Sequence, residues 1–459
     1  MARQTAAQGW PNFPSQLRAT SAAVGLLVIL PALSLSLFPR PRAQGLERLL
    51  GHASLLQSFP VQPGVATPPL WQQLLGPQLA NQAWNRPGLW WQFWAEHGNG
   101  QPFLAISWAA LSSQAQRQLP ANSLRVDDLL VVAPDPLSQK LLGGELRTKQ
   151  RRGRGLDQRC LGRLQQQQSV YWRPAGLGAL LGPIAPLLQR FQQGCMSFEL
   201  QGNQLLFSGE STATEGLWVD GLRASSPSNS SKPLDAKVLL EMGGPGLGIL
   251  LDGLLNRQLV RQPLQDRYGL GAAQLAVIRK TPFVLQLRPV AKGPFQAALQ
   301  LHLAVGNQRR AWAEILQGLR QPLLAQGLSD GPAVPSSPSA TIRSNALPAA
   351  QWRNGDGVLL GGWRWLVQAG RDPELLVFLG PDQAGPDQAG PDQAGPDPAG
   401  SYTQTELRLR PAALARLNLL PPDLPAAVQR SLQLELAAGG APSQPLSPLS
   451  GRLQWDRLR

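Results

Sequence analysis

A stretch of uncharged residues near the N-terminus, Ala19–Pro39 (ATSAAVGLLVILPALSLSLFP), constrains this chain more than any other feature. Arg18 precedes the stretch, and Arg40 and Arg42 follow it. An α-helix rises about 1.5 Å per residue, so the stretch would span roughly 30 Å, which is the thickness of the hydrocarbon core of a bilayer. We therefore expect a transmembrane anchor over 19–39, preceded by a short N-terminal tail over 1–18.

Two other interpretations of this stretch remain open. A cleaved secretory signal needs small residues before its cleavage point, whereas Pro41 and Arg42 stand before Ala43. A soluble core helix normally has a polar face, and this stretch has none. Arginines on both sides leave the orientation undecided by the positive-inside rule. Because a large domain behind an N-terminal anchor is usually translocated, we expect a single-pass membrane protein whose C-terminal domain lies in the periplasm or a lumen.

The chain is basic but sparsely charged. Its 459 residues carry a net charge of +14, although only 15% of them are charged. A hydrophobic content of 43% and 14 tryptophans suffice for a core, and a chain of this length holds two or three ordinary domains. The basic balance suits an anionic membrane surface or nucleic acid. The alternative is a diffuse excess of arginine that serves no partner.

One order of elements recurs along the chain: a strand, a Pro or Gly turn, a leucine-rich helix and two further strands. It is found in 169–210, 236–289 and 405–458. In the second segment, LAVIRK (Leu275–Lys280) and FVLQLRP (Phe283–Pro289) are the predicted pair of strands. Apolar residues at every second position in LQLEL and LRLRP indicate strands with one buried face. We expect an α+β fold of mostly antiparallel sheets with packed helices.

Composition divides the part of the chain that follows the anchor. Prolines punctuate 40–69, which we interpret as a linker with a short amphipathic helix over Leu46–Phe59. An α+β domain over 70–328, a Ser/Pro linker over 329–350 and a C-terminal α+β part over 351–459 follow. Residues 380–400 repeat GPDQA, and a segment rich in Pro and Gly without large apolar side chains predicts a disordered surface loop.

The two cysteines of the chain, Cys160 and Cys195, allow two interpretations. In an exported domain they pair, and closing a loop of this length stabilises the fold by up to about 4 kcal/mol in the chain-entropy model. In a reducing compartment they remain thiols. No histidine lies near them to complete a structural zinc site. The sequence indicates no cofactor and no metal.

The densest basic segment is 147–163, RTKQRRGRGLDQRCLGR. Each basic side chain near an anionic bilayer contributes about 1 kcal/mol, so membrane contact is one interpretation. Nucleic-acid binding is less favoured, because no aromatic residues for base stacking are interleaved. A solvated loop without a partner is the third. The candidate contacts with a membrane or polyanion are Arg147, Lys149, Arg151, Arg152 and Arg154.

Tryptophans crowd the region around LWWQFWAEH. A helix there would place Trp90 and Trp94 on one face. Tryptophan is favoured at membrane interfaces because its ring is apolar and its N–H is polar. Trp90, Trp91 and Trp94 are therefore candidate interfacial aromatics, and core packing is the simpler alternative.

Familiar catalytic arrangements are missing from the sequence. The histidines are His52, His97 and His302, none with metal-ligand spacing, and we expect His302 to face outward from its strand. The segment GGPGLG (Gly243–Gly248) lies between a strand and a helix but has neither the GxGxxG spacing nor a following Gly-Lys-Ser/Thr. We interpret it as a flexible strand–helix corner, predict no catalytic residue, and regard an enzyme as the less favoured interpretation.

The apolar Ala19–Pro39, the corners at Pro174, Pro245 and Pro411 and the terminal SGRLQW carry a resemblance. In this layout the chain resembles uncharacterised membrane-anchored proteins of cyanobacteria, a domain-of-unknown-function family. The resemblance implies a membrane location and repeated strand–helix–strand–strand units, and no activity.

Three functions follow as hypotheses. The first is a non-enzymatic, membrane-anchored protein that binds a protein or lipid partner at the membrane, with no small-molecule ligand identified. The second is a periplasmic hydrolase of unrecognised mechanism. The third is a nucleic-acid-binding protein that uses 147–163, which requires that segment to remain in the cytoplasm.

Overall fold

The computed structural model describes residues 42–96, 100–148, 152–181, 191–213, 234–255, 257–291, 294–331, 350–366, 372–381, 402–420, 424, 426–439 and 445–456. The predicted anchor Ala19–Pro39 and nearly all of the GPDQA repeat lie outside them. Among the helices that are described, none is long and apolar enough to cross a membrane.

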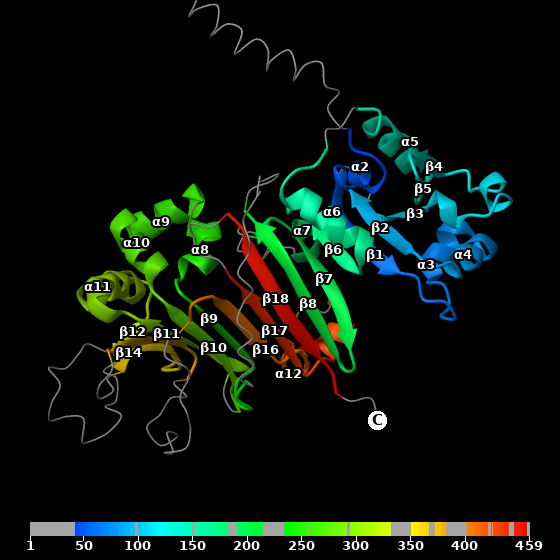
Figure 1. The fold of residues 1–459 in the computed structure, drawn as a ribbon. Coiled ribbons are helices and arrows are strands. Elements are labelled where there is room, and N and C mark those ends of the chain that lie inside the picture. The colour runs from blue at the N-terminus through cyan, green and yellow to red at the C-terminus, as the bar shows by residue number, and fades with distance from the viewer. Residues whose placement is uncertain are drawn as a thin grey trace, which may run out of the picture.

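In the described part of the chain, 18 strands form one sheet that runs through the molecule (Figure 1). All of its strand pairings are antiparallel, and they give the spatial order β4-β5-β3-β2-β1-β6-β7-β8-β18-β17-β16-β9-β10-β11-β15-β14-β13-β12. The strands are β1 (Ala53–Pro60), β2 (Leu89–Ala95), β3 (Phe103–Ser107), β4 (Ser123–Val126), β5 (Leu129–Val132), β6 (Ser169–Trp172), β7 (Gln193–Gln201), β8 (Gln204–Thr212), β9 (Leu240–Gly244), β10 (Phe283–Pro289), β11 (Ala297–Ala304), β12 (Ser329–Gly331), β13 (Ala350–Arg353), β14 (Leu359–Leu366), β15 (Glu374–Leu379), β16 (Thr405–Leu409), β17 (Gln433–Ala438) and β18 (Ser447–Gln454).

Helices connect the strands in a repeated order. The helices are α2 (Leu46–Leu50), α3 (Pro69–Leu75), α4 (Pro77–Trp84), α5 (Pro136–Glu145), α6 (Leu156–Gln166), α7 (Pro174–Leu181), α8 (Gly248–Leu255), α9 (Gln258–Tyr268), α10 (Ala272–Lys280), α11 (Arg309–Ala325), α12 (Pro411–Arg416) and α13 (Ala426–Gln429). Strand–helix–strand–strand segments begin at β1, β6, β9 and β16. Their first strands pair as β1·β6 and β9·β16, and the third strands β8 and β18 join the two halves.

Proline starts five of the described helices, and two of these begin at predicted corners. Pro174 is the first residue of α7 and Pro411 the first of α12. Its fixed φ suits the first helical turn, where its missing N–H is not needed. The corner at GGPGLG is tightly packed, since a Cβ on Gly243 would lie 2.4 Å from the Tyr402 ring and one on Gly246 would lie 2.7 Å from the Arg279 carbonyl oxygen. The corner is therefore closely packed, which differs from the flexible corner that the sequence predicted.

Helices cover both faces of the sheet around β1–β6. On one face, α2, α5 and α6 enclose a core that contains Leu56 and Phe93. On the other face, α3 and α4 enclose Trp90 and Ile106. Because successive side chains of a strand point to opposite faces, strands in this part of the sheet must be apolar at consecutive positions.

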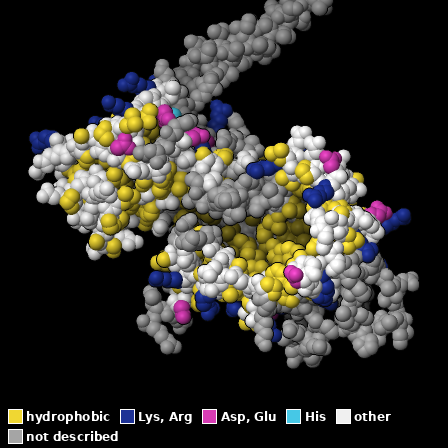
Figure 2. Space-filling view, turned by 180° about the vertical axis from the view of Figure 1, so that it is seen from behind, with side chains coloured by type: hydrophobic (Ala, Val, Ile, Leu, Met, Phe, Trp, Pro, Cys, Tyr) yellow, Lys and Arg dark blue, Asp and Glu magenta, His cyan; other side chains and the backbone are white. Residues whose placement is uncertain are grey.

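The C-terminal part of the sheet is built differently. Helices α8, α10 and α11 pack on one face and bury Phe283, Leu303 and Trp312. The space-filling view in Figure 2 shows a hollow with a hydrophobic floor behind the molecule. On the opposite face, a row of cross-strand neighbours is polar: Gln286 on β10, Glu241 on β9, Arg408 on β16, Glu435 on β17 and Arg452 on β18.

Several expectations about the local structure were wrong. The proposed linker over 40–69 contains α2 and β1, and β1 lies in the interior of the sheet between β2 and β6. Its predicted helix Leu46–Phe59 ends at Leu50, because β1 begins at Ala53. LAVIRK is part of helix α10, so the two strands of its unit are β10 and β11.

The predicted division between 70–328 and 351–459 does not separate two sheets. Strands β16–β18 come from the C-terminal part of the chain but lie between β8 and β9. The proposed linker over 329–350 begins with strand β12 and ends at the first residue of β13, and 332–349 are outside the described residues.

Candidate functional site

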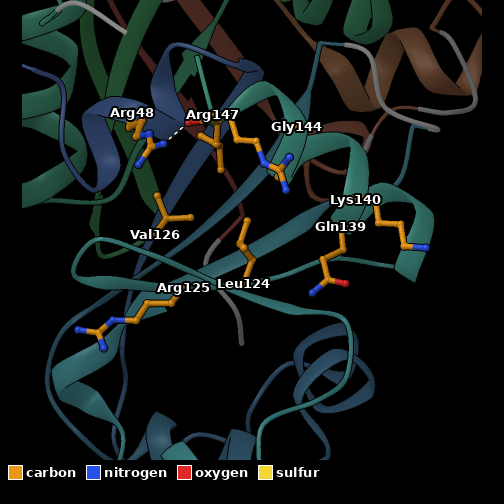
Figure 3. A pocket seen from close by; sticks show the side chains of 10 residues that line it. Arg48, Leu124, Arg125, Val126, Gln139, Lys140, Gly144 and Arg147 are labelled. Carbon is orange, nitrogen blue, oxygen red and sulfur yellow. Dashed lines mark hydrogen bonds between the residues drawn. The ribbon is translucent and has the colours of Figure 1, made fainter. Parts of the chain in front are cut away.

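A pocket of about 490 Å³ lies between α2, β4 and the C-terminal half of α5 (Figure 3). Figure 2 shows several basic side chains at this end of the molecule. The pocket is lined by Arg48 from α2, by Leu124, Arg125 and Val126 from β4, and by Gln139, Lys140, Gly143, Gly144, Leu146 and Arg147 from α5 and the residues that follow it.

The start of α2 is fixed to the turn between β4 and β5. The backbone N–H of Gly45 donates a hydrogen bond to Asp127 Oδ2 at 2.7 Å. Glycine is required there, because Gly45 has φ +53° and a Cβ would lie 2.2 Å from Asp128 Oδ1. Asp127 also has a positive φ, of 53°. This junction sets the position of Arg48, which follows within the first turn of α2.

Helix α5 is held at its start and along its side. Asp135 caps it by accepting a hydrogen bond from the backbone N–H of Ser138 at 2.9 Å, and Pro136 is its first residue. Asp and Pro are favoured at these two positions. Gln139 Nε2 donates to the Ser123 carbonyl oxygen on β4 at 2.6 Å. The wall that carries Lys140 is therefore rigidly attached to β4.

Among the described residues that line the pocket, four are cationic and none is acidic. Arg48 Nη2 donates to the Leu146 carbonyl oxygen, and Arg48 Nη1 lies 3.7 Å from Asp127 Oδ1. Arg125 donates to the Asp127 carbonyl oxygen at 3.3 Å and lies over the Trp108 ring. Lys140 and Arg147 are exposed, and neither side chain has a hydrogen bond or ion pair with any residue that the structure describes.

The structure divides the predicted basic segment between two places. Arg147 lines the pocket, whereas Arg152 Nε lies 3.7 Å from Glu47 Oε1, on α2. The Gly153 N–H donates to the same oxygen at 2.8 Å, so the segment around Arg154 is attached to α2 as well. Lys149 and Arg151 lie outside the described residues. The residues that sequence reasoning missed are Arg48, Arg125 and Lys140, which are far apart in the chain and form no local cluster.

Cys160 and Cys195 form a disulfide that joins α6 to β7. Both cysteines are fully buried. The structure therefore agrees with the interpretation in which the two cysteines form a disulfide. The pairing holds α6 against the face of the sheet that α2 and α5 also cover.

The tryptophans occupy a strand and not the predicted helix. Trp90, Trp91 and Trp94 belong to β2, so neighbouring side chains point to opposite faces. Trp90 is 1% exposed and packs against Trp71 and Trp84. Trp91 is 8% exposed and donates from Nε1 to the Leu164 carbonyl oxygen at 2.9 Å. Trp94 is half-buried beside the Leu55 cluster. Trp90 and Trp91 are therefore core residues, which corrects their proposed interfacial role.

A buried polar cluster lies between β6, β7 and α6. Tyr171 donates from its hydroxyl to Asp157 Oδ1 at 3.0 Å, and Arg173 Nε donates to that hydroxyl at 2.9 Å. Gln193 Nε2 donates to Asp157 Oδ1 at 2.6 Å. Burial, reinforced by Asp157, raises the pKa of Tyr171 well above its usual range. These groups satisfy one another, which is the arrangement of a structural network.

Each of the two histidines that the structure describes lies beside one carboxylate. His302 is 6% exposed and lies 3.8 Å from Glu374 on the neighbouring strand, so the expectation that it faces outward was wrong. His52 lies 3.7 Å from Glu145, and His97 is outside the described residues. In the part of the chain that the structure describes, no three His, Cys, Asp or Glu side chains are grouped so as to hold a metal ion.

Comparisons of the chain with protein-family models, with curated proteins and with solved structures gave no match.

Proposed function

We propose that this protein is a non-enzymatic binding protein that acts at a membrane, and that its basic end contacts the anionic surface of that membrane. The observation that carries the proposal is the position of the basic residues. Arg48, Arg147 and Arg152 gather around α2, which begins at Leu46, soon after the uncharged stretch ends at Pro39. At about 3.5 Å per residue, the intervening chain keeps Arg48 within roughly 30 Å of Pro39.

Electrostatics supports this arrangement. The negative surface potential of a membrane acts within about a Debye length, close to 8 Å at physiological salt. The limit of roughly 30 Å between Arg48 and Pro39 allows these basic side chains to approach the membrane surface to within that distance. Lys140 and Arg147 have no anionic partner among the described residues, so contact with lipid would replace no protein ion pair.

The disulfide supports the proposed side of the membrane. Disulfides persist in oxidising compartments and are rare in the cytosol. The Cys160–Cys195 bridge therefore fits a C-terminal domain in the periplasm or a lumen. On that side the domain has no access to cytoplasmic nucleic acid, which disfavours nucleic-acid binding.

Fractionation and topology of the full chain test the proposal. Wild-type protein should sediment with membranes and resist extraction at alkaline pH. Leu27→Arg combined with Leu30→Arg should release it, because an arginine at the centre of a membrane helix costs about 3 kcal/mol, whereas Leu27→Ala with Leu30→Ala should not. A reporter active only outside the cytoplasm, fused after Arg459, should be active. Wild-type protein in the soluble fraction would overturn the proposal.

A further inference from the structure

The pocket between α2, β4 and α5 has the size and the lining of a small-molecule site. Its volume of about 490 Å³ lies within the range of about 300–1,000 Å³ that is usual for ligand pockets. Its lining combines apolar side chains, Leu124 and Val126, with cationic ones. Asp127 lies 3.7 Å from Arg48 and offsets one of these charges, and the remaining positive charge favours the binding of an anion.

Two of the four cations are held in place before any ligand arrives. Arg48 is fixed by the Leu146 carbonyl oxygen and by Asp127. Arg125 is fixed by the Asp127 carbonyl oxygen and by the Trp108 ring, whose centroid lies 4.5 Å from its guanidinium carbon. Side chains that are already ordered lose less entropy when they bind, and arginine matches the geometry of phosphate oxygens. Lys140 and Arg147 leave their donors available.

Glycines leave one wall of the pocket open. Gly143 and Gly144 lie in the last turns of α5, and Gly144 is exposed. A Cβ on Gly144 would meet no heavy atom within 4 Å, and one on Gly143 would meet only Leu124 Cδ2 at 4.0 Å. Glycine lowers helix propensity relative to alanine, and no packing contact requires it at these two positions in the last turn of α5. What they provide is room beside the cations.

We propose that this pocket binds the phosphate group of a phosphate ester, with Arg48, Lys140 and Arg147 as phosphate ligands and with Leu124 against the organic part of the ester. The apolar wall favours an ester over inorganic phosphate. The inference rests on the proposed function in one respect, the source of the phosphate ester. That source is the headgroup of an anionic phospholipid in the membrane that carries the chain.

Calorimetric titration of the detergent-solubilised full chain tests the pocket, with glycerol 3-phosphate and inorganic phosphate as probes. Glycerol 3-phosphate should bind more tightly than inorganic phosphate. Lys140→Gln combined with Arg147→Gln should weaken it by about a hundredfold, at about tenfold for each charged contact. The control is Arg261→Gln with Arg267→Gln, which removes the same charge from exposed positions on α9 and should bind as wild type does.

A second pair of variants separates the pocket from diffuse positive charge. Gly144→Phe fills the pocket and retains every cation, so it should abolish binding. Gly162→Phe is its control, since Gly162 lies in α6, outside the pocket lining, and a Cβ there also meets no heavy atom within 4 Å. Melting curves confirm that each variant is folded. Binding by Gly144→Phe at wild-type affinity, or no binding by the wild type, would overturn the proposal.

Nanodiscs distinguish the two sources of phosphate. With the full chain in phosphatidylglycerol discs, the lipid headgroups should occupy the pocket and weaken glycerol 3-phosphate binding by about tenfold relative to phosphatidylcholine discs. Equal affinity in both discs overturns the lipid source. Failure of the proposed function shows itself separately, as soluble wild-type protein in the fractionation experiment, and leaves the detergent titrations interpretable.

Discussion

The strands around β1–β6 and those around β9–β18 belong to the same sheet but differ in how many of their faces are covered by helices. In the first region both faces are covered by helices, and consecutive residues such as Trp90 and Trp91 are buried. In the second region one face is packed against helices, and the other carries the polar row from Gln286 to Arg452. A strand's hydrophobic pattern therefore reports how many of its faces are covered.

The difference extends to how each region is stabilised. The first region adds a covalent link between a covering helix and the sheet, Cys160–Cys195. In the second, Arg408 Nη2 lies 2.7 Å from Glu406 Oε2, and Arg408 Nη1 lies 3.8 Å from Glu241 Oε1. An ion pair on a nearly buried face contributes little net stability, but removing one partner leaves the other charge unpaired.

The strongest test of the comparison places a charge on one face of the sheet. Helices cover this face in the first region but not in the second. Leu56→Glu puts a carboxylate where the side chain is 0% exposed, among Phe93 and other apolar residues. We expect the free energy of unfolding to fall by more than about 4 kcal/mol, because the charge is buried without a partner. The control is Ser208→Glu, on the same sheet face in β8 but exposed. The free energy of unfolding of this control should change by less than about 0.5 kcal/mol in urea titrations.

Removing the disulfide sharpens the comparison, since only the first region has one among the described residues. Cys160→Ala combined with Cys195→Ala should lower the free energy of unfolding by up to about 4 kcal/mol, through the larger entropy of the unfolded chain. Wild-type protein in reductant should behave like the double variant. If reductant shifted the denaturation midpoint of both proteins equally, the bridge would not be the cause.

A third variant tests the polar row. Arg408 is 6% exposed, and Arg408→Met removes the cation that pairs with both Glu241 and Glu406. We expect the free energy of unfolding to fall by about 3 kcal/mol. Adding Glu241→Gln and Glu406→Gln should recover most of this loss, because no buried charge then remains.

The matched position in the same row is Arg452, whose side chain is 28% exposed beside Glu435. Arg452→Met should cost less than about 1 kcal/mol, since water solvates the carboxylate that remains. If Arg408→Met and Arg452→Met lowered the free energy of unfolding equally in the same urea titrations, burial would not determine how much each arginine of the row contributes to stability.

The smallest expected effect concerns His52, in the first region. Burial lowers its pKa below 6.5, with the charges of Arg173 and Arg48 acting in the same direction and Glu145 opposing them. As pH falls below 6.5, the unfolded chain takes up the proton before the folded one. Stability should therefore decrease as pH falls from 6.5 to the lowered pKa, and then level off. His52→Gln should remove this part of the pH dependence of urea unfolding, and an unchanged slope would contradict it.

Sequence reasoning succeeded in predicting strands from alternation. LQLEL and LRLRP alternate and lie largely in β17 and β16, but their leucines are only half-buried, and the buried residues of β16 are Thr405 and Arg408. It failed for LWWQFWA, since a strand with two buried faces has no alternation and resembles a buried helix. The sequence did not predict the pocket, for a different reason. Arg48, Arg125 and Arg147 come from separate parts of the chain, and only the pairing of β4 with β5 and the docking of α2 bring them together.

What the sequence by itself determined is local: the alternation of strands and helices, proline at the helix starts, and the uncharged stretch Ala19–Pro39. The tertiary structure decided which strands pair. Nothing local in β8 or β18 specifies that they are neighbours, and their pairing places the C-terminal strands between β8 and β9. The physical reason is that period-2 patterning chooses which face is buried, whereas the choice of partner depends on what the whole chain can bury together.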